Sequence, residues 1–331
     1  MKTRFAFVGF RHPHIFDVLS AVRDRPDCQI VACCEEDAAT RQALRETDRV
    51  DLTHEDYAEM LRDVECDVIA IGDYYGRRGA LALAALRAGR HVLSDKPLCT
   101  SLSDQAQIED ISSKRCLSVG LQLDCRGAGP FIRLRDIIRS GDLGKVCTIH
   151  IGAQHPLLAA SRPPWYFEPG KHGGTINDIG IHVFDLVPWL TGIPWEEVVR
   201  ARSWNAKASA YPDFHDCAQF MAVLQGGAGV FADLSYLAPD KAGYNLPHYW
   251  RVLVHGTKGF AETYLRAINV NVVLDHQDIV EQRPVAPPMS RRYFSDFMNE
   301  VRGHKEACDL RTADCLLASR LAIQTQSRAT G

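Results

Sequence analysis

The sequence lacks both an excess of charge of either sign and a long apolar run. Its 38 basic and 41 acidic residues leave a formal net charge of −3, and no run of Lys and Arg forms a local basic tract. A dedicated nucleic-acid binder that relies on phosphate contacts is therefore not expected. No window approaches the ~18 consecutive apolar residues of a membrane span. We expect neither nucleic acid nor a membrane as a partner.

A cysteine pattern typical of metal sites or disulfide frameworks is also missing. The chain has 11 cysteines but no C-x-x-C pair. Structural zinc sites need clustered ligands, so no metal is expected. The first residues, MKTRFAFVGF, have neither the length nor the small-residue cleavage site of a signal peptide. A cytoplasmic protein with buried, reduced thiols is the expectation.

What is present suits a globular protein of about two domains, with 331 residues, 46% of them hydrophobic. In residues 1–122, strand-length apolar runs alternate with helical patterns; the strands are expected at 3–9, 29–34, 67–72, 91–94 and 117–121. This alternation predicts an α/β domain with a parallel sheet covered on both faces. Thr53, with Asp56 three residues later, and Ser101 are expected to cap helices, and Gly89 to end one.

Residues 123–331 have a different pattern. Helices are expected at 131–140 and around Trp189, and a closing helix carries Phe294, Phe297, Met298 and Val301. Strands are expected at 146–151, 198–204, 218–224, 230–237, 251–255 and 270–274. The alternation of apolar and polar residues at 230–236 is the period of a sheet covered on one side. The second domain is therefore predicted to be α+β, with a largely antiparallel open sheet and helices on one face.

The first strand ends at Gly9-Phe10-Arg11-His12-Pro13-His14, where a dinucleotide fingerprint G-x-G-x-x-G belongs. Only the first glycine matches, because Arg11 and His14 replace the other two. A strand-to-helix turn that binds nothing explains the segment equally well, although a guanidinium at a helix N-terminus suits a pyrophosphate. The spacing of His12 and His14 allows a metal, but surface or packing histidines are the simpler interpretation.

The second strand ends at Glu35-Glu36-Asp37, about 25 residues after the glycine turn. A carboxylate here can accept both hydroxyls of an adenine ribose and would repel a 2′-phosphate. We favour the ribose role for Glu35. The alternative is a solvated acidic loop that caps the next helix.

Two later segments are more specific. Ser94-Asp95-Lys96-Pro97 follows a predicted strand, and the bond before its proline is a candidate cis peptide. Residues 173–185 read GGTINDIGIHVFD. Their glycines allow a sharp turn that presents Asp178 and His182 at one helix entry, four residues apart and on one face. Capping by Asp178 and burial of His182 is the structural alternative.

Both segments resemble the Gfo/Idh/MocA family of oxidoreductases. Asp95-Lys96-Pro97 is similar to its Glu-Lys-Pro signature, and residues 173–185 are similar to its G-G-x-x-x-D-x-G-x-H-x-x-D segment. DVIAIGDYYGRRGALALAALRAGRHVLSDKPL and GTKGFAET resemble further family segments. The resemblance implies an N-terminal Rossmann domain, a nicotinamide cofactor, and a C-terminal sheet that binds substrate and makes a homodimer or homotetramer.

By this resemblance the protein is an NAD-dependent dehydrogenase acting on a secondary alcohol of a sugar or polyol, with NADP the less favoured cofactor. His182 takes the hydroxyl proton, Lys96 stabilises the developing alkoxide and Asp178 orients the imidazole or holds a hydroxyl. The cofactor-binding residues expected are Gly9, Phe10, Arg11, His12, Glu35, Asp73, Tyr75, Asp95, Lys96 and Gln122. The substrate-binding residues expected are His155, Trp165, Tyr166 and Tyr236.

The chain departs from the family pattern along the expected cofactor groove. Asp73-Tyr74-Tyr75 followed by Arg78 replaces the family's Thr-Pro-Asn and His, and Gln122 replaces a frequent Asn. Two other functions stay open: a glycosidase that uses NAD transiently, and a regulator that senses NAD or a sugar. A metal held by His155, Asp178 and His182 is a further alternative.

Overall fold

The computed structural model describes residues 2–246 and 249–329, and the chain divides into two compact units. The first unit contains Met1–Gln122, Pro163–Gly173 and Tyr293–Arg320; the second contains Leu123–Arg162, Gly174–Arg292 and Leu321–Gly331. The first segment of the first unit ends at Gln122. Two segments expected in the second domain, 163–173 and 293–320, belong to the first unit instead.

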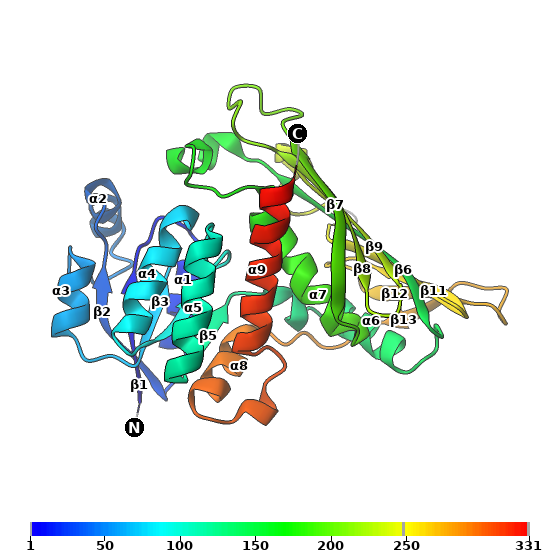
Figure 1. The fold of residues 1–331 in the computed structure, drawn as a ribbon, viewed down its shortest axis with the longest axis horizontal. Coiled ribbons are helices and arrows are strands. Elements are labelled where there is room, and N and C mark those ends of the chain that lie inside the picture. The colour runs from blue at the N-terminus through cyan, green and yellow to red at the C-terminus, as the bar shows by residue number, and fades with distance from the viewer. Residues whose placement is uncertain (1, 247–248, 330–331) are drawn as a thin grey trace. The chain divides into compact units, whose positions relative to one another are not determined.

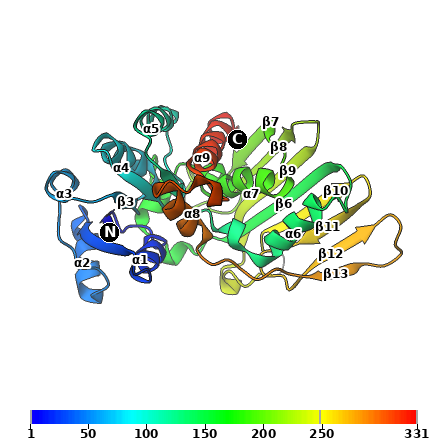
Figure 2. The same cartoon turned by 90° about the horizontal axis from the view of Figure 1, so that it is seen from below.

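The first unit is built on a five-stranded parallel sheet in the order β2-β1-β3-β4-β5. Its strands are β1 (Thr3–Val8), β2 (Cys28–Cys34), β3 (Val68–Ile71), β4 (His91–Ser94) and β5 (Val119–Leu121). Its N-terminal helices are α1 (Ile15–Arg23), α2 (Ala38–Thr47), α3 (Tyr57–Asp63), α4 (Tyr75–Arg87) and α5 (Leu102–Arg115). All four residues of β3 are buried, as expected for a strand covered on both faces. Figure 2 shows α4 and α5 on one face of this sheet and α1 on the other.

The later segments complete this unit because its sheet needs further apolar cover. In α8 (Arg292–Val301), the Phe294 ring lies 5.9 Å from the Phe5 ring of β1. A Cβ on Gly120 of β5 would lie 2.6 Å from the Phe297 ring. Thr312, the first residue of α9 (Thr312–Arg328), accepts a hydrogen bond from Val119 N–H through its hydroxyl. Residues 293–320 therefore contribute apolar side chains to the core of the first unit.

The second unit is built on an eight-stranded sheet in the order β13-β12-β11-β10-β6-β9-β8-β7. All its neighbouring strands are antiparallel except β6 and β9. The strands are β6 (Val146–Pro156), β7 (Trp195–Trp204), β8 (Cys217–Leu224), β9 (Gly229–Ala238), β10 (Arg251–Gly256), β11 (Gly259–Thr263), β12 (Asn269–Leu274) and β13 (Glu281–Pro284). The predicted α/β plus α+β fold class is confirmed.

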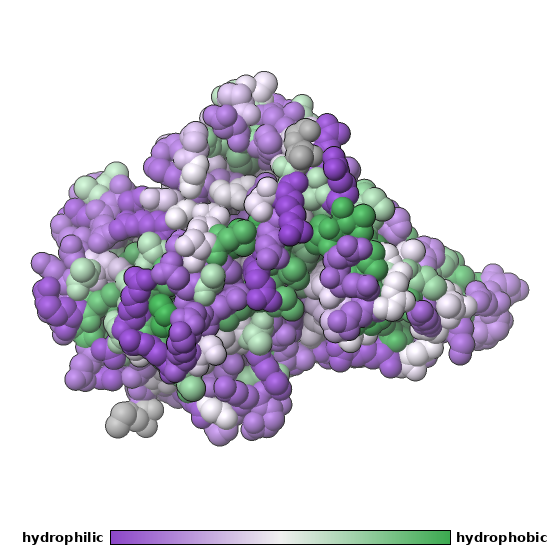
Figure 3. All heavy atoms as spheres, viewed as in Figure 1, coloured by the Kyte–Doolittle hydropathy of each residue, from purple (hydrophilic) through white to green (hydrophobic). Residues whose placement is uncertain are grey.

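Helices cover one face of this second sheet. Figure 1 shows α6 (Gly129–Arg139) and α7 (Ile181–Thr191) along it. In β8, Ala218, Phe220 and Ala222 are buried, whereas Met221 between them is exposed. Figure 3 shows hydrophobic patches among hydrophilic side chains along these strands. No described helix is both long and apolar enough to cross a membrane.

The ends of the helices can be compared with the capping residues predicted from the sequence. Ser101 caps α5 by accepting a hydrogen bond from Asp104 N–H, and Gly89 follows α4 with a φ of +75°, as predicted. The predicted Thr53 cap is wrong. Asp56 caps α3 by accepting from Glu59 N–H, and the Thr53 hydroxyl bonds the backbone of Cys33 in β2. A carboxylate one residue before the helix is the stronger cap, and Thr53 satisfies a strand edge instead.

Candidate functional site

The turn after β1 requires glycine at its first position. Gly9 has a φ of +74°, and a Cβ there would lie 2.6 Å from the Cβ of Asp73, which follows β3. Gly9 thus permits two carboxyl ends of the parallel sheet to approach each other. His12 N–H donates to Gly72 O, and Phe10 N–H donates to the Glu35 carboxylate. Two backbone N–H groups of this turn therefore donate hydrogen bonds within the protein.

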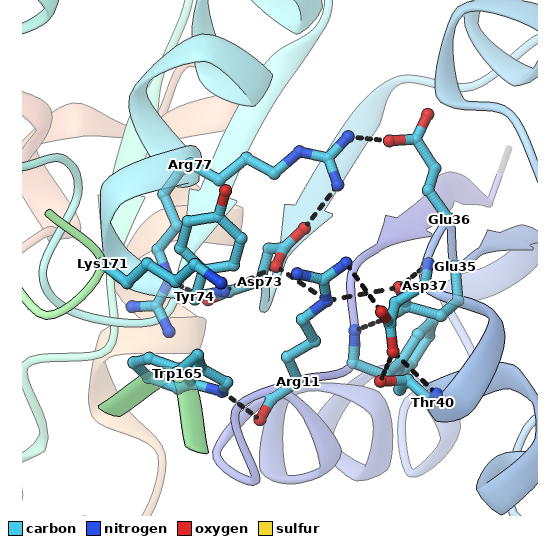
Figure 4. Close-up of polar contacts among 12 residues, drawn as sticks. Arg11, Glu35, Glu36, Asp37, Thr40, Asp73, Tyr74, Arg77, Trp165 and Lys171 are labelled. Carbon is cyan, nitrogen blue, oxygen red and sulfur yellow. Dashed lines mark hydrogen bonds and ion pairs between the residues drawn. The ribbon is translucent and has the colours of Figure 1, made fainter. Parts of the chain in front are cut away.

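The Arg11 side chain lies among three carboxylates (Figure 4). Its guanidinium is 3.8 Å from Glu35, 3.4 Å from Asp37 and 3.4 Å from Asp73. It also lies 5.2 Å from the centre of the Tyr74 ring. The Arg11 side chain is 17% exposed, so an anionic ligand can reach its guanidinium near the N-terminal end of α1.

Asp73 has an unusual environment for a carboxyl group. It accepts from Tyr74 N–H and pairs with Arg77, and it is almost completely buried. Burial raises the pKa of Asp73 to about 6, although the charge of Arg11 and the Tyr74 hydrogen bond oppose that rise. Such a carboxyl changes charge in the physiological range.

The acidic residues after β2 serve mainly as hydrogen-bond acceptors. Glu35 is fully buried and accepts from Phe10 N–H and Asp37 N–H. Glu36 accepts from Tyr57 N–H and pairs with Arg77. Asp37 caps α2 by accepting from Thr40 N–H. The capping alternative is thus confirmed for Asp37, while Glu36 and Asp37 keep part of their carboxylates at the surface.

The Asp95-Lys96-Pro97 segment follows β4, and its Lys96–Pro97 bond is cis. Asp95 is fully buried; its carboxylate lies 2.8 Å from Arg78, 2.5 Å from His12 and 3.3 Å from His14. Burial lowers the pKa of His12 to about 4, although the charge of Asp95 favours its protonation. His12 is therefore neutral at pH 7.

Two predicted substrate residues lie in an aromatic cluster of the first unit. The ring of Trp165 is 5.2 Å from that of Tyr75 and 5.4 Å from that of Tyr166. Tyr166 also contacts His172, with 4.4 Å between ring centres. Trp165 Nε1 donates to Arg11 O at 3.4 Å. Tyr75 is buried and its hydroxyl lies 3.2 Å from His12 Nε2, so it supports the turn from inside the unit.

In the second unit, Asp178 lies on a π-helical turn, Ile176–Gly180, that leads into α7. Gly174 has a φ of +93°, and a Cβ there would lie 2.2 Å from the Gln326 amide carbon. That amide accepts from Ile176 N–H and holds the start of the turn. The Tyr236 hydroxyl donates a hydrogen bond to the Asp178 carboxylate. π-Helical turns occur often at functional sites.

His182 lies in the first turn of α7 and is 6% exposed. Its Nδ1 is 3.7 Å from Cys125 Sγ, and its ring contacts Trp250 edge-on at 5.3 Å. Sequence reasoning missed Cys125 and Trp250. Trp250 has a φ of +53°, rare for an aromatic residue, and no sequence signal indicates it. For Cys125, the only sequence signal is the helical pattern that begins at residue 131, and this pattern does not indicate the cysteine itself.

His155 and Tyr236, the other predicted substrate residues, belong to an aromatic cluster of the second unit. The His155 ring lies 6.2 Å from Tyr236, 5.8 Å from Tyr244, 5.2 Å from Tyr249 and 5.8 Å from Trp250. Burial raises the pKa of Tyr249 far above its usual value, so this hydroxyl stays protonated. The cluster offers ring faces together with the hydroxyl groups of its tyrosines.

Two sets of described residues have ligand atoms within 4.8 Å of one another: His12, His14 and Asp95, and Asp124, Cys125 and His182. The set of His155, Asp178 and His182 considered from the sequence is not among these. In the first set, Arg78 already neutralises Asp95. At the end of β5, Gln122 Oε1 is buried, and within the described structure it has no hydrogen-bond partner. It is an available acceptor at the carboxyl edge of the sheet.

These features define a class of protein with an NAD-binding Rossmann domain. Residues 3–121 match the family model described as an oxidoreductase family with an NAD-binding Rossmann fold, and residues 131–262 match the GFO/IDH/MocA C-terminal domain. The chain belongs to the GFO/IDH/MocA family of oxidoreductases.

Relatives with assigned activities are similar over different lengths. Inositol 2-dehydrogenase 2 of Saccharopolyspora erythraea is 26% identical over 304 residues, covering 87% of this chain and 79% of that protein. D-glucoside 3-dehydrogenase of Escherichia coli is 28% identical over 184 residues, 55% of this chain and 52% of that protein. The chain thus matches about half the length of several curated relatives.

Solved structures show the same fold at low identity. An inositol dehydrogenase homologue of Azotobacter vinelandii complexed with NAD⁺ has a TM-score of 0.80 at 17% identity, covering 99% of this chain and 96% of that one. The WlbA dehydrogenase of Bordetella pertussis, complexed with NADH and UDP-GlcNAcA, has a TM-score of 0.78 at 20% identity, covering 99% and 97%.

Proposed function

We propose that the protein is an NAD-dependent dehydrogenase that interconverts a secondary alcohol and a ketone on a sugar, polyol or related hydroxylated molecule. The observation that carries this proposal is the arrangement of Asp178 and His182 on successive turns, each with a side-chain partner from another element. The names of the inositol and glucoside dehydrogenases support the substrate class.

The chemistry of the donor and acceptor groups fits a dinucleotide. We assign the cationic Arg11 to the pyrophosphate and the acceptor Gln122 Oε1 to the nicotinamide half. Gly9, Phe10, His12, Asp73 and Lys96 complete the set of residues proposed to contact the cofactor. The buried side chains of Glu35, Tyr75 and Asp95 hold these residues in place. Because Glu36 and Asp37 present negative charge where NADP would carry its 2′-phosphate, NAD is the proposed cofactor.

In this proposal the nicotinamide supplies the hydride acceptor for alcohol oxidation. His182, with Nδ1 toward Cys125, accepts the hydroxyl proton at Nε2. The Lys96 ammonium donates a hydrogen bond to the same oxygen as negative charge develops. Asp178 accepts from Tyr236 and holds a neighbouring substrate hydroxyl or the imidazole. Trp165, Tyr166, His155 and Tyr236 are proposed to line the substrate site.

The test begins with the absorbance spectrum and mass of the purified protein, which report retained NAD(H). NAD and NADP are then titrated into cofactor-free protein, and a panel of inositols and glucosides is screened for NADH formation. We expect NAD to bind at least ~10-fold tighter than NADP, since like charges placed together cost several kcal/mol. NADH must form with at least one member of the panel.

Two other results would replace the proposal. Release of a leaving group from a glycoside without net NADH would indicate a glycosidase that uses NAD transiently. Binding of NAD or a sugar without turnover would indicate a regulator.

We also propose that the protein is cytoplasmic and that it forms a homodimer or homotetramer through the second sheet.

A further inference from the structure

Arg78 lies in an environment that is unfavourable for a positively charged side chain. It lies in the first turn of α4, where the helix dipole opposes a positive charge. Its side chain is also completely buried. Buried cations are rare unless every donor is used. The side chain therefore needs a specific set of acceptors, and the first unit supplies them.

The Arg78 guanidinium binds two segments of the first unit. Its Nε donates to Asp73 O at 2.7 Å, at the end of β3. Its Nη1 donates to Asp95 O at 2.9 Å, Lys96 O at 2.6 Å and Pro97 O at 3.2 Å. Its Nη2 donates to the Asp95 carboxylate at 2.8 Å. One planar group thus contacts three successive carbonyls around Lys96.

These contacts restrain the backbone of Lys96 itself. A residue has two soft backbone torsions, φ and ψ, and its peptide groups are planar. Fixing the carbonyl before Lys96 and its own carbonyl restrains both torsions, and therefore the direction in which its side chain leaves the backbone. A lysine at position 78 could not reproduce this effect, because its ammonium lacks the planar fork of donors.

Asp95 keeps the guanidinium in place from the other side. Its carboxylate faces Arg78, His12 and His14. Burial favours the neutral acid, but the charge of Arg78 and the contacts of His12 and His14 outweigh it and hold the pKa of Asp95 well below its usual range. The Asp95 carboxylate therefore stays charged and keeps its hydrogen bond from Arg78 over the working pH range.

We propose that Arg78 is a positioning residue for the reaction: it holds the backbone of residues 95–97 so that Lys96 is directed at the reacting oxygen. The proposal rests on the function proposed above for Lys96. Arg78 acts through the backbone of this segment and not by touching the substrate.

The test compares Arg78→Lys with Arg126→Lys. Arg126 is the matched control because it too is a buried arginine paired with a buried carboxylate, Asp185, but in the second unit. The first readout needs no substrate: the rate at which sulfo-NHS-acetate acetylates Lys96, measured by peptide mass spectrometry, with Lys258 as internal reference. We expect Arg78→Lys to raise the Lys96 rate at least threefold, and Arg126→Lys to leave it unchanged.

The second readout is kinetic. With the fastest inositol or glucoside of the panel, Arg78→Lys should lower kcat on the order of 10²-fold while the Kd for NAD stays within threefold, because displacement of a catalytic group by 1 Å can cost that much. If Arg78→Ala folds, added guanidinium should restore part of kcat. An Arg78→Lys variant that is destabilised like Arg126→Lys but keeps wild-type acetylation and kcat would overturn the proposal.

The two proposals fail separately. If the wild-type protein oxidises no member of the panel, the dehydrogenase function fails, whereas Lys96 acetylation still reports whether Arg78 holds the segment. If the wild type is active and acetylation of Lys96 is the same in Arg78→Lys, the positioning role fails alone.

Discussion

Lys96 carries its charge on a side chain that is only 7% exposed. If this ammonium stabilises an alkoxide that exists only near the transition state, its loss affects the rate far more than it affects cofactor binding. Lys96→Met should lower kcat on the order of 10²–10³-fold, the usual cost of removing one such donor. The Kd for NAD should stay within a few-fold. A variant that loses NAD affinity but turns over normally at saturating NAD would make Lys96 a residue for cofactor positioning.

His182 and Asp178 are distinguished by the pH dependence of the rate. A neutral imidazole is needed to accept the proton, so oxidation falls as the pH drops and the imidazole becomes protonated. His182→Asn should remove most of the rate and flatten the acid limb of the pH profile. Asp178→Asn should be milder, because it removes a charge but leaves the proton acceptor.

Initial rates from pH 5 to 9 measure both effects, with circular dichroism and NAD affinity as controls. If His182→Asn folds, binds NAD and keeps the wild-type profile, His182 is not the base. Equal losses in both variants would mean that the pair titrates as one coupled site.

Asp73 makes folding stability depend on pH in a direction unusual for a carboxyl group. Its folded pKa of about 6 lies above the ordinary value of 3.8. The folded state therefore binds more protons between these values, and the Asp73 contribution to stability decreases as the pH rises from about 4 to 6. His12, with its lowered pKa, acts oppositely over about pH 4 to 6.5.

Asp73→Asn isolates this contribution. The free energy of unfolding of the variant, relative to wild type, should increase by at most about 3 kcal/mol between pH 4 and pH 6, since each pKa unit corresponds to 1.36 kcal/mol. Urea unfolding at several pH values measures the difference. A difference that stays constant with pH would show that Asp73 titrates normally.

At the scale of elements, we propose that Arg11, in the turn from β1 to α1, contacts the pyrophosphate at the position where the dinucleotide fingerprint has its second glycine. Arg11 and Arg77 both pair with Asp73, but only Arg11 lies in this turn. Arg11→Gln should weaken NAD binding about tenfold and reduce its salt dependence, because one charge-assisted contact is lost. Arg77→Gln is the matched control and should stay within about threefold by calorimetry. Equal effects would mean that the whole charge cluster, and not the turn, binds the cofactor.

The parallel sheet could be read from the sequence because each buried strand is a short apolar run with a turn signal at its end. His91–Ser94 was predicted to the residue, and the six strands expected in the second sheet differ from the observed ones by one to five residues at one or both ends. β13 was missed because Glu281–Pro284 is polar and half-exposed. Residues 281–284 form a strand because they pair with β12, and their own sequence has no strand pattern.

In the candidate site, the features that depend on local sequence alone could be predicted. The turn at Gly9, the cis bond before Pro97 and the placement of Asp178 and His182 follow from local sequence. The contacts of Cys125 with His182 and of Arg78 with residues 95–97 join segments 57 and 17–19 residues apart. Such contacts depend on packing. The burial of Glu35 also could not be predicted. It depends on a contact between its side chain and the N–H of Phe10, which lies 25 residues earlier in the chain.

At the scale of the whole molecule, the uncovered side of the second sheet is the surface through which we propose that copies associate. Met221 of β8 is 55% exposed and Val199 of β7 is 56% exposed. Met221→Asp should shift the protein from oligomer to monomer in sedimentation velocity, since a buried unpaired charge opposes association. Ile268→Asp, which also changes an exposed apolar residue but lies outside the strands, should leave the oligomer intact. A wild-type monomer would contradict this mode of assembly.

The composition of the first unit affects how the chain folds during its synthesis. Phe294 packs on Phe5, and Thr312 accepts the hydrogen bond of Val119 N–H, so the nucleotide-binding sheet is completed by residues translated about three hundred positions after it begins. When the ribosome has released residues 1–122, the apolar face that α8 later covers is still open to solvent. The second sheet is synthesised in the interval, before the first core can close. The core of the Rossmann unit therefore cannot be completed until almost the whole chain has been synthesised, and part of its apolar surface stays exposed until then.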